Sequence, residues 1–189
     1  DEKTVLVAPS WHEGNIFETC ALPLFQSLLH SGFHVIARPH DETLKRNPKL
    51  LFALRDHFKG EQRFCLDLDM KSDESLQRAA VLITDWSGIA FEWAIVKERP
   101  TLFVNTKMKI HNEDYEELGI APIEIQQRDF FGKNIEEREV EGAGVLAEDL
   151  LKNKECCVER IRGFRDKMIC HFGQAAQVGG QYILDLVKD

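Results

Sequence analysis

The sequence predicts an α/β protein, a Rossmann-like parallel sheet with helices on both of its faces. Short apolar segments that are typical of buried strands recur through the first half of the chain. Segments with the apolar spacing of helices lie between them, and this alternation is the signature of parallel strands joined by crossover helices. The length of 189 residues, of which 43% are hydrophobic, fits a single domain that spans 1–189.

Each expected element is justified by its own start or end signal. Asn15 is an N-cap candidate for a helix from Ile16 to about His30, and Gly32 occupies the position at which such a helix ends. The five expected strands are Thr4–Ala8, Phe33–Ala37, Phe64–Leu68, Ala80–Ile83 and Thr101–Val104. The other helices of this half are expected from Asp41 through Leu50, Leu51 and Leu54, after the N-cap candidate Ser72, and over Ser87–Val96.

The second half of the chain is less regular. The stretch from 105 to about 144 reads as a charged excursion, and its mostly acidic run Glu136–Glu141 is expected to form a solvated face or loop. Helical patterns return at 145–151, 158–169 and 175–187. No internal repeat or low-complexity linker interrupts them, so the sequence gives no reason to divide the chain further.

Composition excludes several classes of function. The formal net charge of −8 leaves no basic field for a nucleic-acid partner. The five cysteines include no CxxC pair and indicate a reduced, cytoplasmic setting, and no apolar run reaches membrane-spanning length. No cofactor or metal is expected, because no histidine pair has metal-ligand spacing. The histidines expected to be surface or structural residues are His30, His34, His57, His111 and His171.

The turn after the fourth expected strand carries the clearest signal for a ligand. Ser87 and Gly88 stand where a helix begins, and the free amides of a helix N-terminus bind anions, phosphate above all. Asp85 adds a carboxylate at the same strand end. Trp86 either packs beneath the loop or forms a wall of a ligand cleft. Alone, this turn is equally well explained as an ordinary capped connection.

Two other turns are expected at the same edge of the sheet, because the carboxyl ends of parallel strands meet there. Arg38 and His40 follow the second strand, where guanidinium can bind phosphate through two donors and imidazole can transfer a proton. Ser10, Trp11 and His12 follow the first strand. Each turn is weak evidence by itself, but three polar turns on one edge favour a shared ligand.

These residues occur in an order that resembles a known family. The motifs are Ala8-Pro9-Ser10-Trp11, Ala37-Arg38-Pro39-His40, and Val81-Leu82-Ile83-Thr84-Asp85-Trp86-Ser87 with Phe91-Glu92 and Arg99-Pro100 after it. Together they resemble the CDP-glycerol glycerophosphotransferases, the teichoic-acid primases and polymerases. The chain departs from the family pattern at Gly88, where a second serine is usual, and at His12, where arginine is common.

The resemblance implies a GT-B fold, of which this chain matches the C-terminal, donor-binding half. It implies that His40 and Arg38 act on the donor pyrophosphate, that Ser87 and Gly88 bind it, and that Asp69 lies near the cytosine. It further implies that a CDP-linked polyol phosphate donates its glycerophosphate group to a polyol or glycan acceptor in cell-envelope polymer synthesis. The family's activating histidine belongs to an N-terminal half, which this chain would need as a partner at the inner membrane face.

Two other readings of the sequence stay open. The first is the half of a GT-B sugar transferase or nucleotide-sugar epimerase that uses a UDP-sugar. The second is a non-catalytic nucleotide-binding or protein-docking domain. Preference for cytidine or uridine nucleotides separates the two enzymatic readings, and failure to bind either favours the non-catalytic one.

Overall fold

A single parallel sheet forms the centre of the molecule. The computed structural model describes residues 3–110, 112, 114–120 and 122–187. In this part of the chain six parallel strands pair in the order β3-β2-β1-β4-β5-β6. They are β1 (Thr4–Val7), β2 (His34–Ala37), β3 (Phe64–Leu66), β4 (Val81–Thr84), β5 (Thr101–Asn105) and β6 (Gly132–Glu136). The chain moves outward in one direction from β1 and in the other from β4, so the order reverses between these two strands, where open α/β sheets bind ligands.

Helices cover both faces of the sheet, as the sequence predicts. In β1, Val5 and Val7 belong to one buried cluster while Leu6 belongs to the other, because successive side chains of a strand point to opposite faces. The first face is covered by α1 (Ile16–Thr19), α2 (Ala21–His30), α4 (Pro48–His57) and α9 (Ala143–Lys152). The second is covered by α5 (Glu74–Arg78), α6 (Ile89–Lys97), α8 (Arg128–Phe131) and α10 (Lys154–Met168).

Two helices expected as continuous are each divided in the structure. The helix after β1 is broken at Cys20, whose φ of −134° is not helical, into α1 and α2. The helix after β2 ends as α3 (Asp41–Arg46), and α4 begins at Pro48. Proline disfavours the helical conformation in the residue before it, and Asn47 accordingly has φ −135° and ψ 54°. Apolar spacing alone does not reveal such breaks.

The charged excursion contains a strand that the sequence analysis missed. β6 pairs with β5 over five residues, although only Gly132 and Ile135 of its sequence are buried. A Cβ on Gly132 would lie 1.6 Å from the carbonyl oxygen of Thr101, so β6 can approach β5 only with glycine there. The excursion also forms η1 (Tyr115–Leu118), α7 (Ile123–Gln126) and α8.

The acidic run is only partly the solvated segment that its composition predicts. It forms the end of β6 and a short helix, η2 (Glu137–Gly142). Glu136, Glu139 and Glu141 are exposed, but Val140 is buried in the core. An amphipathic turn of helix therefore stands where charge alone indicates a loop.

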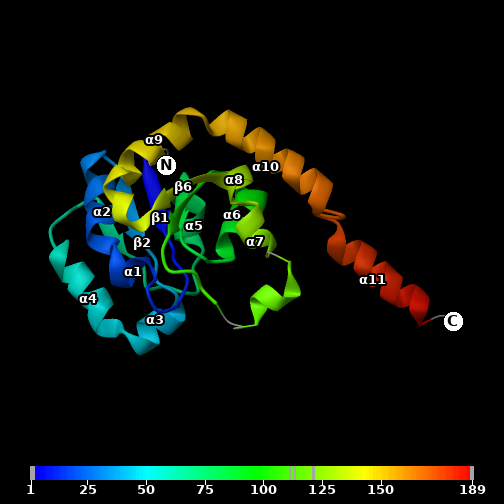
Figure 1. The fold of residues 1–189 in the computed structure, drawn as a ribbon. Coiled ribbons are helices and arrows are strands. Elements are labelled where there is room, and N and C mark those ends of the chain that lie inside the picture. Colours follow the sequence, from blue (N-terminus) through cyan, green and yellow to red (C-terminus); the bar gives the residue numbers. More distant parts are fainter. Residues whose placement is uncertain (1–2, 111, 113, 121, 188–189) are drawn as a thin grey trace.

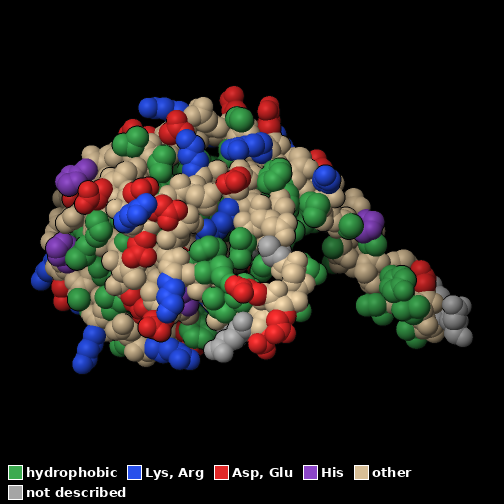
Figure 2. All heavy atoms as spheres, in the orientation of Figure 1, with side chains coloured by type: hydrophobic (Ala, Val, Ile, Leu, Met, Phe, Trp, Pro, Cys, Tyr) green, Lys and Arg blue, Asp and Glu red, His purple; other side chains and the backbone are tan. Residues whose placement is uncertain are grey.

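The C-terminal helix α11 (Ala175–Leu186) projects from the body as an arm (Figure 1). None of its residues is buried, and Figure 2 shows hydrophobic side chains gathered on it. Among the described residues, no helix is both long and apolar enough to cross a membrane. The histidines expected at the surface are exposed, except that His111 lies outside the described residues; the exposed ones are His30, His34, His57 and His171.

Candidate functional site

The turn after β4 is built around the buried carboxylate of Asp85, which is 1% exposed. Its Oδ1 accepts hydrogen bonds from the amides of Ser10 and Trp86, both at 2.7 Å, and its Oδ2 accepts one from Ile16 at 3.3 Å. Burial raises the pKa of Asp85, and these amides oppose that shift. Asp85 therefore joins the β4 turn to the turn after β1, and its oxygens face the protein interior.

Ser87 and Gly88 lie where the sequence predicts them, at the start of α6. Gly88 is the N-cap residue, and no side chain caps the first amides of the helix. Ser87 is half-buried and Gly88 is exposed. A helix beginning in this way presents amides and a positive dipole end to a ligand at the carboxyl edge of the sheet.

The turn after β1 brings an aromatic side chain into a cluster of cations. Ser10 is buried, while the Trp11 ring is half-buried and its centroid lies 6.2 Å from that of His40. Arg46 lies 5.1 Å and Lys109 lies 5.5 Å from the Trp11 ring centroid. The turns after β1 and β2 therefore meet, and two cations that the sequence analysis missed join them.

Arg38 follows β2 as predicted, but its guanidinium is already bound within the protein. Nη1 donates to Oδ2 of Asp67 at 3.0 Å and to Oγ of Ser75 at 2.7 Å, and the Arg38 side chain is 11% exposed. Asp67 follows β3 and Ser75 lies in α5. Arg38 therefore joins the carboxyl ends of two neighbouring strands, β2 and β3, a contact that no local motif predicts.

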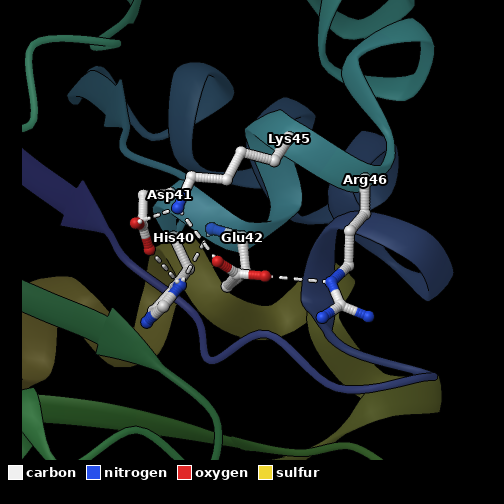
Figure 3. Close-up of polar contacts among 5 residues, drawn as sticks. All are labelled: His40, Asp41, Glu42, Lys45 and Arg46. Carbon is white, nitrogen blue, oxygen red and sulfur yellow. Dashed lines mark hydrogen bonds and ion pairs between the residues drawn. The ribbon is translucent and has the colours of Figure 1, made fainter.

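His40 is the more accessible of the two residues predicted to be catalytic, with 39% of its side chain exposed. It is the N-cap of α3, and its Nδ1 lies 3.2 Å from the amide of Glu42 and 2.8 Å from Oδ1 of Asp41 (Figure 3). Neutral Nδ1 accepts from the Glu42 amide, whereas protonated Nδ1 donates to Asp41. Figure 3 shows the other ring nitrogen on the side away from both partners, which leaves Nε2 open to a ligand.

The carboxylates beside His40 are held by the cations of α3. Lys45 donates to Asp41 at 2.9 Å and to Glu42 at 3.0 Å, and Arg46 donates to Glu42 at 2.9 Å (Figure 3). The hydrogen bond from Lys45 is the main cause that lowers the pKa of Asp41. Asp41 therefore stays ionised near neutral pH and provides a fixed acceptor for a protonated His40.

The loop after β5 closes the group of turns. His12 Nε2 lies 2.8 Å from the carbonyl oxygen of Lys107, which makes Nε2 the donor, and Nδ1 is buried without a partner among the described residues. Trp86 Nε1 donates to the carbonyl oxygen of Thr106 at 3.1 Å. Trp86 is half-buried, and this hydrogen bond ties its indole to the loop after β5.

Asp69 is linked to these contacts through Asp67, the partner of Arg38. It is exposed after β3, its amide donates to Oδ1 of Asp67 at 3.0 Å, and its own Oδ1 accepts from the amide of Lys71 at 3.0 Å. The structure places it on the same edge of the sheet as the other turns, because it also follows a parallel strand. Its bonds are those of local turns.

Two hollows lie elsewhere on the molecule. A cavity of about 620 Å³ is bordered by Ala80 and Pro100, at the amino ends of β4 and β5, and a groove of about 370 Å³ runs beside Leu22 and Leu54 of α2 and α4. Neither includes a residue of the strand-end turns. The described residues also hold no cluster of three or more histidine, cysteine or acidic side chains suited to a metal.

Comparison with known proteins identifies the fold. Neither a protein-family model nor a curated protein matches the chain significantly. Among solved structures, a variant of the wall teichoic acid polymerase TagF is similar over 100% of this chain and 44% of its own, with 22% identity and a TM-score of 0.57. A protein from Listeria monocytogenes described as a UDP-N-acetylglucosamine 2-epimerase is similar over 84% of this chain and 39% of its own, with 16% identity and a TM-score of 0.50. The chain thus spans less than half the length of either protein, and its fold is the α/β fold of GT-B enzymes.

Proposed function

We propose that this chain is the nucleotide-donor-binding half of a GT-B transferase that uses a CDP-activated polyol phosphate such as CDP-glycerol. The observation that carries the proposal is the meeting of the turns after β1, β2 and β4 at the carboxyl edge, beside the point where strand order reverses. Ser10 contacts Asp85, and Trp11 lies against His40. This edge is where sheets of this kind bind nucleotides.

The charges at this edge suit a diphosphate in spite of the net charge of −8. His40, Arg46 and Lys109 surround Trp11, and α6 begins nearby with uncapped amides. Local cations and helix amides stabilise phosphate oxygens over short distances, whereas the charge of remote surface carboxylates is screened by salt. Arg38, held by Asp67, supports this arrangement by fixing the turn that carries His40.

In the proposed reaction an acceptor hydroxyl attacks the phosphorus that bears the glycerol. The bond from that phosphorus to the bridging oxygen breaks, and CMP leaves with the electron pair. Protonated His40, together with the amides of the α6 N-terminus, stabilises the charge that develops on the CMP phosphate. The base that accepts the proton of the acceptor hydroxyl comes from a second, N-terminal half. Contact with the inner membrane face, where the polymer grows, is likewise assigned to parts outside this chain.

Calorimetric titration of the chain with CDP, CDP-glycerol, CMP, UDP and UDP-N-acetylglucosamine tests donor choice. We expect cytidine diphosphates to bind at least ~10-fold more tightly than uridine diphosphates, which is a difference of about 1.4 kcal/mol. Preference for uridine would instead favour a UDP-sugar enzyme, the function described for the second structural neighbour. If neither nucleotide binds at millimolar concentration, the proposal is wrong and a non-catalytic, protein-docking domain replaces it.

His40→Ala tests the assigned chemistry in the enzyme that contains both halves. We expect turnover to fall on the order of 10²-fold or more, because a proton donor or oxyanion-stabilising group is lost. His57→Ala is the matched control, since His57 is an exposed histidine of α4. Equal turnover of the His40 variant and the wild type in steady-state assays would remove His40 from the mechanism.

A further inference from the structure

A buried arginine lies directly beneath the β4 turn, and no sequence motif pointed to it. Arg128 opens α8 in the excursion between β5 and β6 and is only 6% exposed. Its guanidinium carbon lies 4.0 Å from the ring centroid of Trp86 and 4.6 Å from that of Phe103. An arginine is rarely buried unless its donors and its charge are satisfied, so its partners indicate what it does.

The donors of Arg128 bind the turn itself and the end of the neighbouring strand. Nη2 donates to the carbonyl oxygen of Asp85, and Nη1 donates to Oδ1 of Asn105 at 2.8 Å. Asn105 in turn donates through Nδ2 to Glu136 at 2.8 Å, at the end of β6. One planar group therefore links the turn after β4 to the carboxyl ends of β5 and β6.

The charge of Arg128 persists at this site. Burial lowers the pKa of Arg128 to about 10, while the nearby Asp85 carboxylate favours the charged form. Two aromatic faces add cation–π attraction. The guanidinium is therefore still protonated at neutral pH, against the Asp85 carbonyl and the Trp86 ring that precede Ser87 and Gly88.

We propose that Arg128 is a positioning residue for the donor diphosphate, acting by clamping the Asp85 carbonyl and the Trp86 ring so that the following amides face the phosphates. The inference rests on the proposed function. By holding the carbonyl of Asp85, Arg128 fixes the orientation of the Asp85–Trp86 peptide, which leads into the amides of Ser87 and Gly88. Arg128 itself is buried against Asp85 and Trp86, so it works through the turn.

The clamp requires the shape of arginine as well as its charge. A planar guanidinium stacks on Trp86 while two of its donors reach separate acceptors, Asp85 and Asn105. The ammonium of lysine is a compact point charge and cannot repeat this geometry. Arg128→Lys therefore separates positioning from charge, and Arg128→Met removes charge while keeping an unbranched apolar stem.

The experiment measures calorimetric affinities of the 189-residue chain for CDP and CMP. We expect both Arg128 variants to lose ~10-fold or more in CDP affinity but less than about 3-fold in CMP affinity, because a fixed turn serves the second phosphate most. Arg55→Met is the matched control; it removes the same charge from an exposed arginine of α4 that pairs with Asp56. Its affinities should equal those of the wild type.

Two further readouts keep positioning distinct from loss of folding. Thermal melts set an assay temperature at which every variant is folded, and Arg128→Lys replaces Arg128→Met if the latter melts too low. Tryptophan emission should change in the Arg128 variants but not in Arg55→Met, since Arg128 stacks on Trp86. Wild-type CDP affinity in folded Arg128→Lys, or equal losses for CDP and CMP, would overturn the inference. Failure of the wild type itself to bind CDP would overturn the proposed function, and the inference with it.

Discussion

Asp85 shows how one side chain can organise a site that it does not enter. Its carboxylate binds the amides of Ser10, Ile16 and Trp86, which belong to two different turns. Desolvation of a buried carboxylate is costly, and hydrogen bonds from three amides offset much of that cost. Asp85 is a candidate ligand contact by its position in the sequence, and in the structure its carboxylate holds the two turns together.

Asp85→Asn should destabilise the protein by about 1–3 kcal/mol. The asparagine NH₂ group would replace the oxygen that accepts from the amide of Ile16, so two donors would face each other. The loss should also depend on pH. Burial raises the pKa of Asp85, so the native state binds this proton more tightly than the unfolded state does. This contribution to the free energy of unfolding is present at low pH and is lost as the pH rises through the pKa of Asp85 in the folded state.

Urea unfolding at pH 4 and pH 7 checks both expectations. The free energy of unfolding of the wild type should exceed that of Asp85→Asn by more at pH 4 than at pH 7, because the raised pKa of Asp85 still stabilises the wild type at pH 4. Asp56→Asn serves as the control, because the Asp56 side chain is 64% exposed. An equal difference in the free energy of unfolding at both pH values would contradict a raised pKa for Asp85.

At the scale of elements, the contact between α2 and α9 depends on a glycine. A Cβ on Gly144 would lie 2.1 Å from Oγ of Ser31 and 2.6 Å from the carbonyl oxygen of Ser27. Ser27 also donates to the carbonyl oxygen of Glu141 at 2.6 Å and accepts from the amide of Gly144 at 3.1 Å. The two helices therefore approach backbone to backbone over the first face of the sheet.

Gly144→Ala should cost about 1–3 kcal/mol, because the helices must move apart and the Ser27 bonds lengthen. Gly163→Ala, in α10, should instead stabilise the protein by about 0.5–1 kcal/mol, since nothing lies within 4 Å of its added Cβ and alanine is the better helix former. Chemical denaturation measures both. If Gly144→Ala stabilised the protein as Gly163→Ala is expected to, the close approach of α2 and α9 would not be what Gly144 provides.

The same scale explains what the sequence predicted and what it missed. β1, β2, β4 and β5 are apolar runs buried on both faces, so local pattern sufficed to find them. β6 forms a strand because it pairs with β5, and Gly132 allows the two backbones to approach closely enough for that pairing. Its own residues carry no apolar run from which pairing can be read.

The candidate site follows the same division. The turns that carry Ser10, His40 and Ser87 were predictable, because parallel strands place their carboxyl ends on one edge. The binding of Arg38 to Asp67 and the burial of Arg128 under Trp86 join residues distant in sequence. Such contacts depend on tertiary packing, and the spacing of residues in a single sequence does not predict them.

For the whole molecule, the projecting α11 is the least supported part. It has no buried residue, whereas α9, of similar length, buries Ala143, Gly144, Ala147 and Leu150. Isolated helices of this size are marginal in water, so their stability must come from packing. In the proposed two-half enzyme, α11 is the element placed to receive that packing from outside the chain.

Hydrogen exchange followed by mass spectrometry measures this difference. In the chain alone, amides of α11 should exchange ~10-fold faster or more than those of α9, because exchange follows the free energy of local opening. Protection of α11 equal to that of α9 would mean that the arm is covered in solution, for example by a second copy. Dilution of the sample would then distinguish that association.

The shortness of β3 matters for how these molecules behave when crowded. An exposed sheet edge offers unpaired peptide groups on which a neighbouring chain can align, the first step of fibril growth. At this edge the strand has only three residues, Phe64–Leu66, so few such groups are on offer. At this edge, a sheet whose interior strands are rich in valine, leucine and isoleucine therefore offers little on which another chain can align.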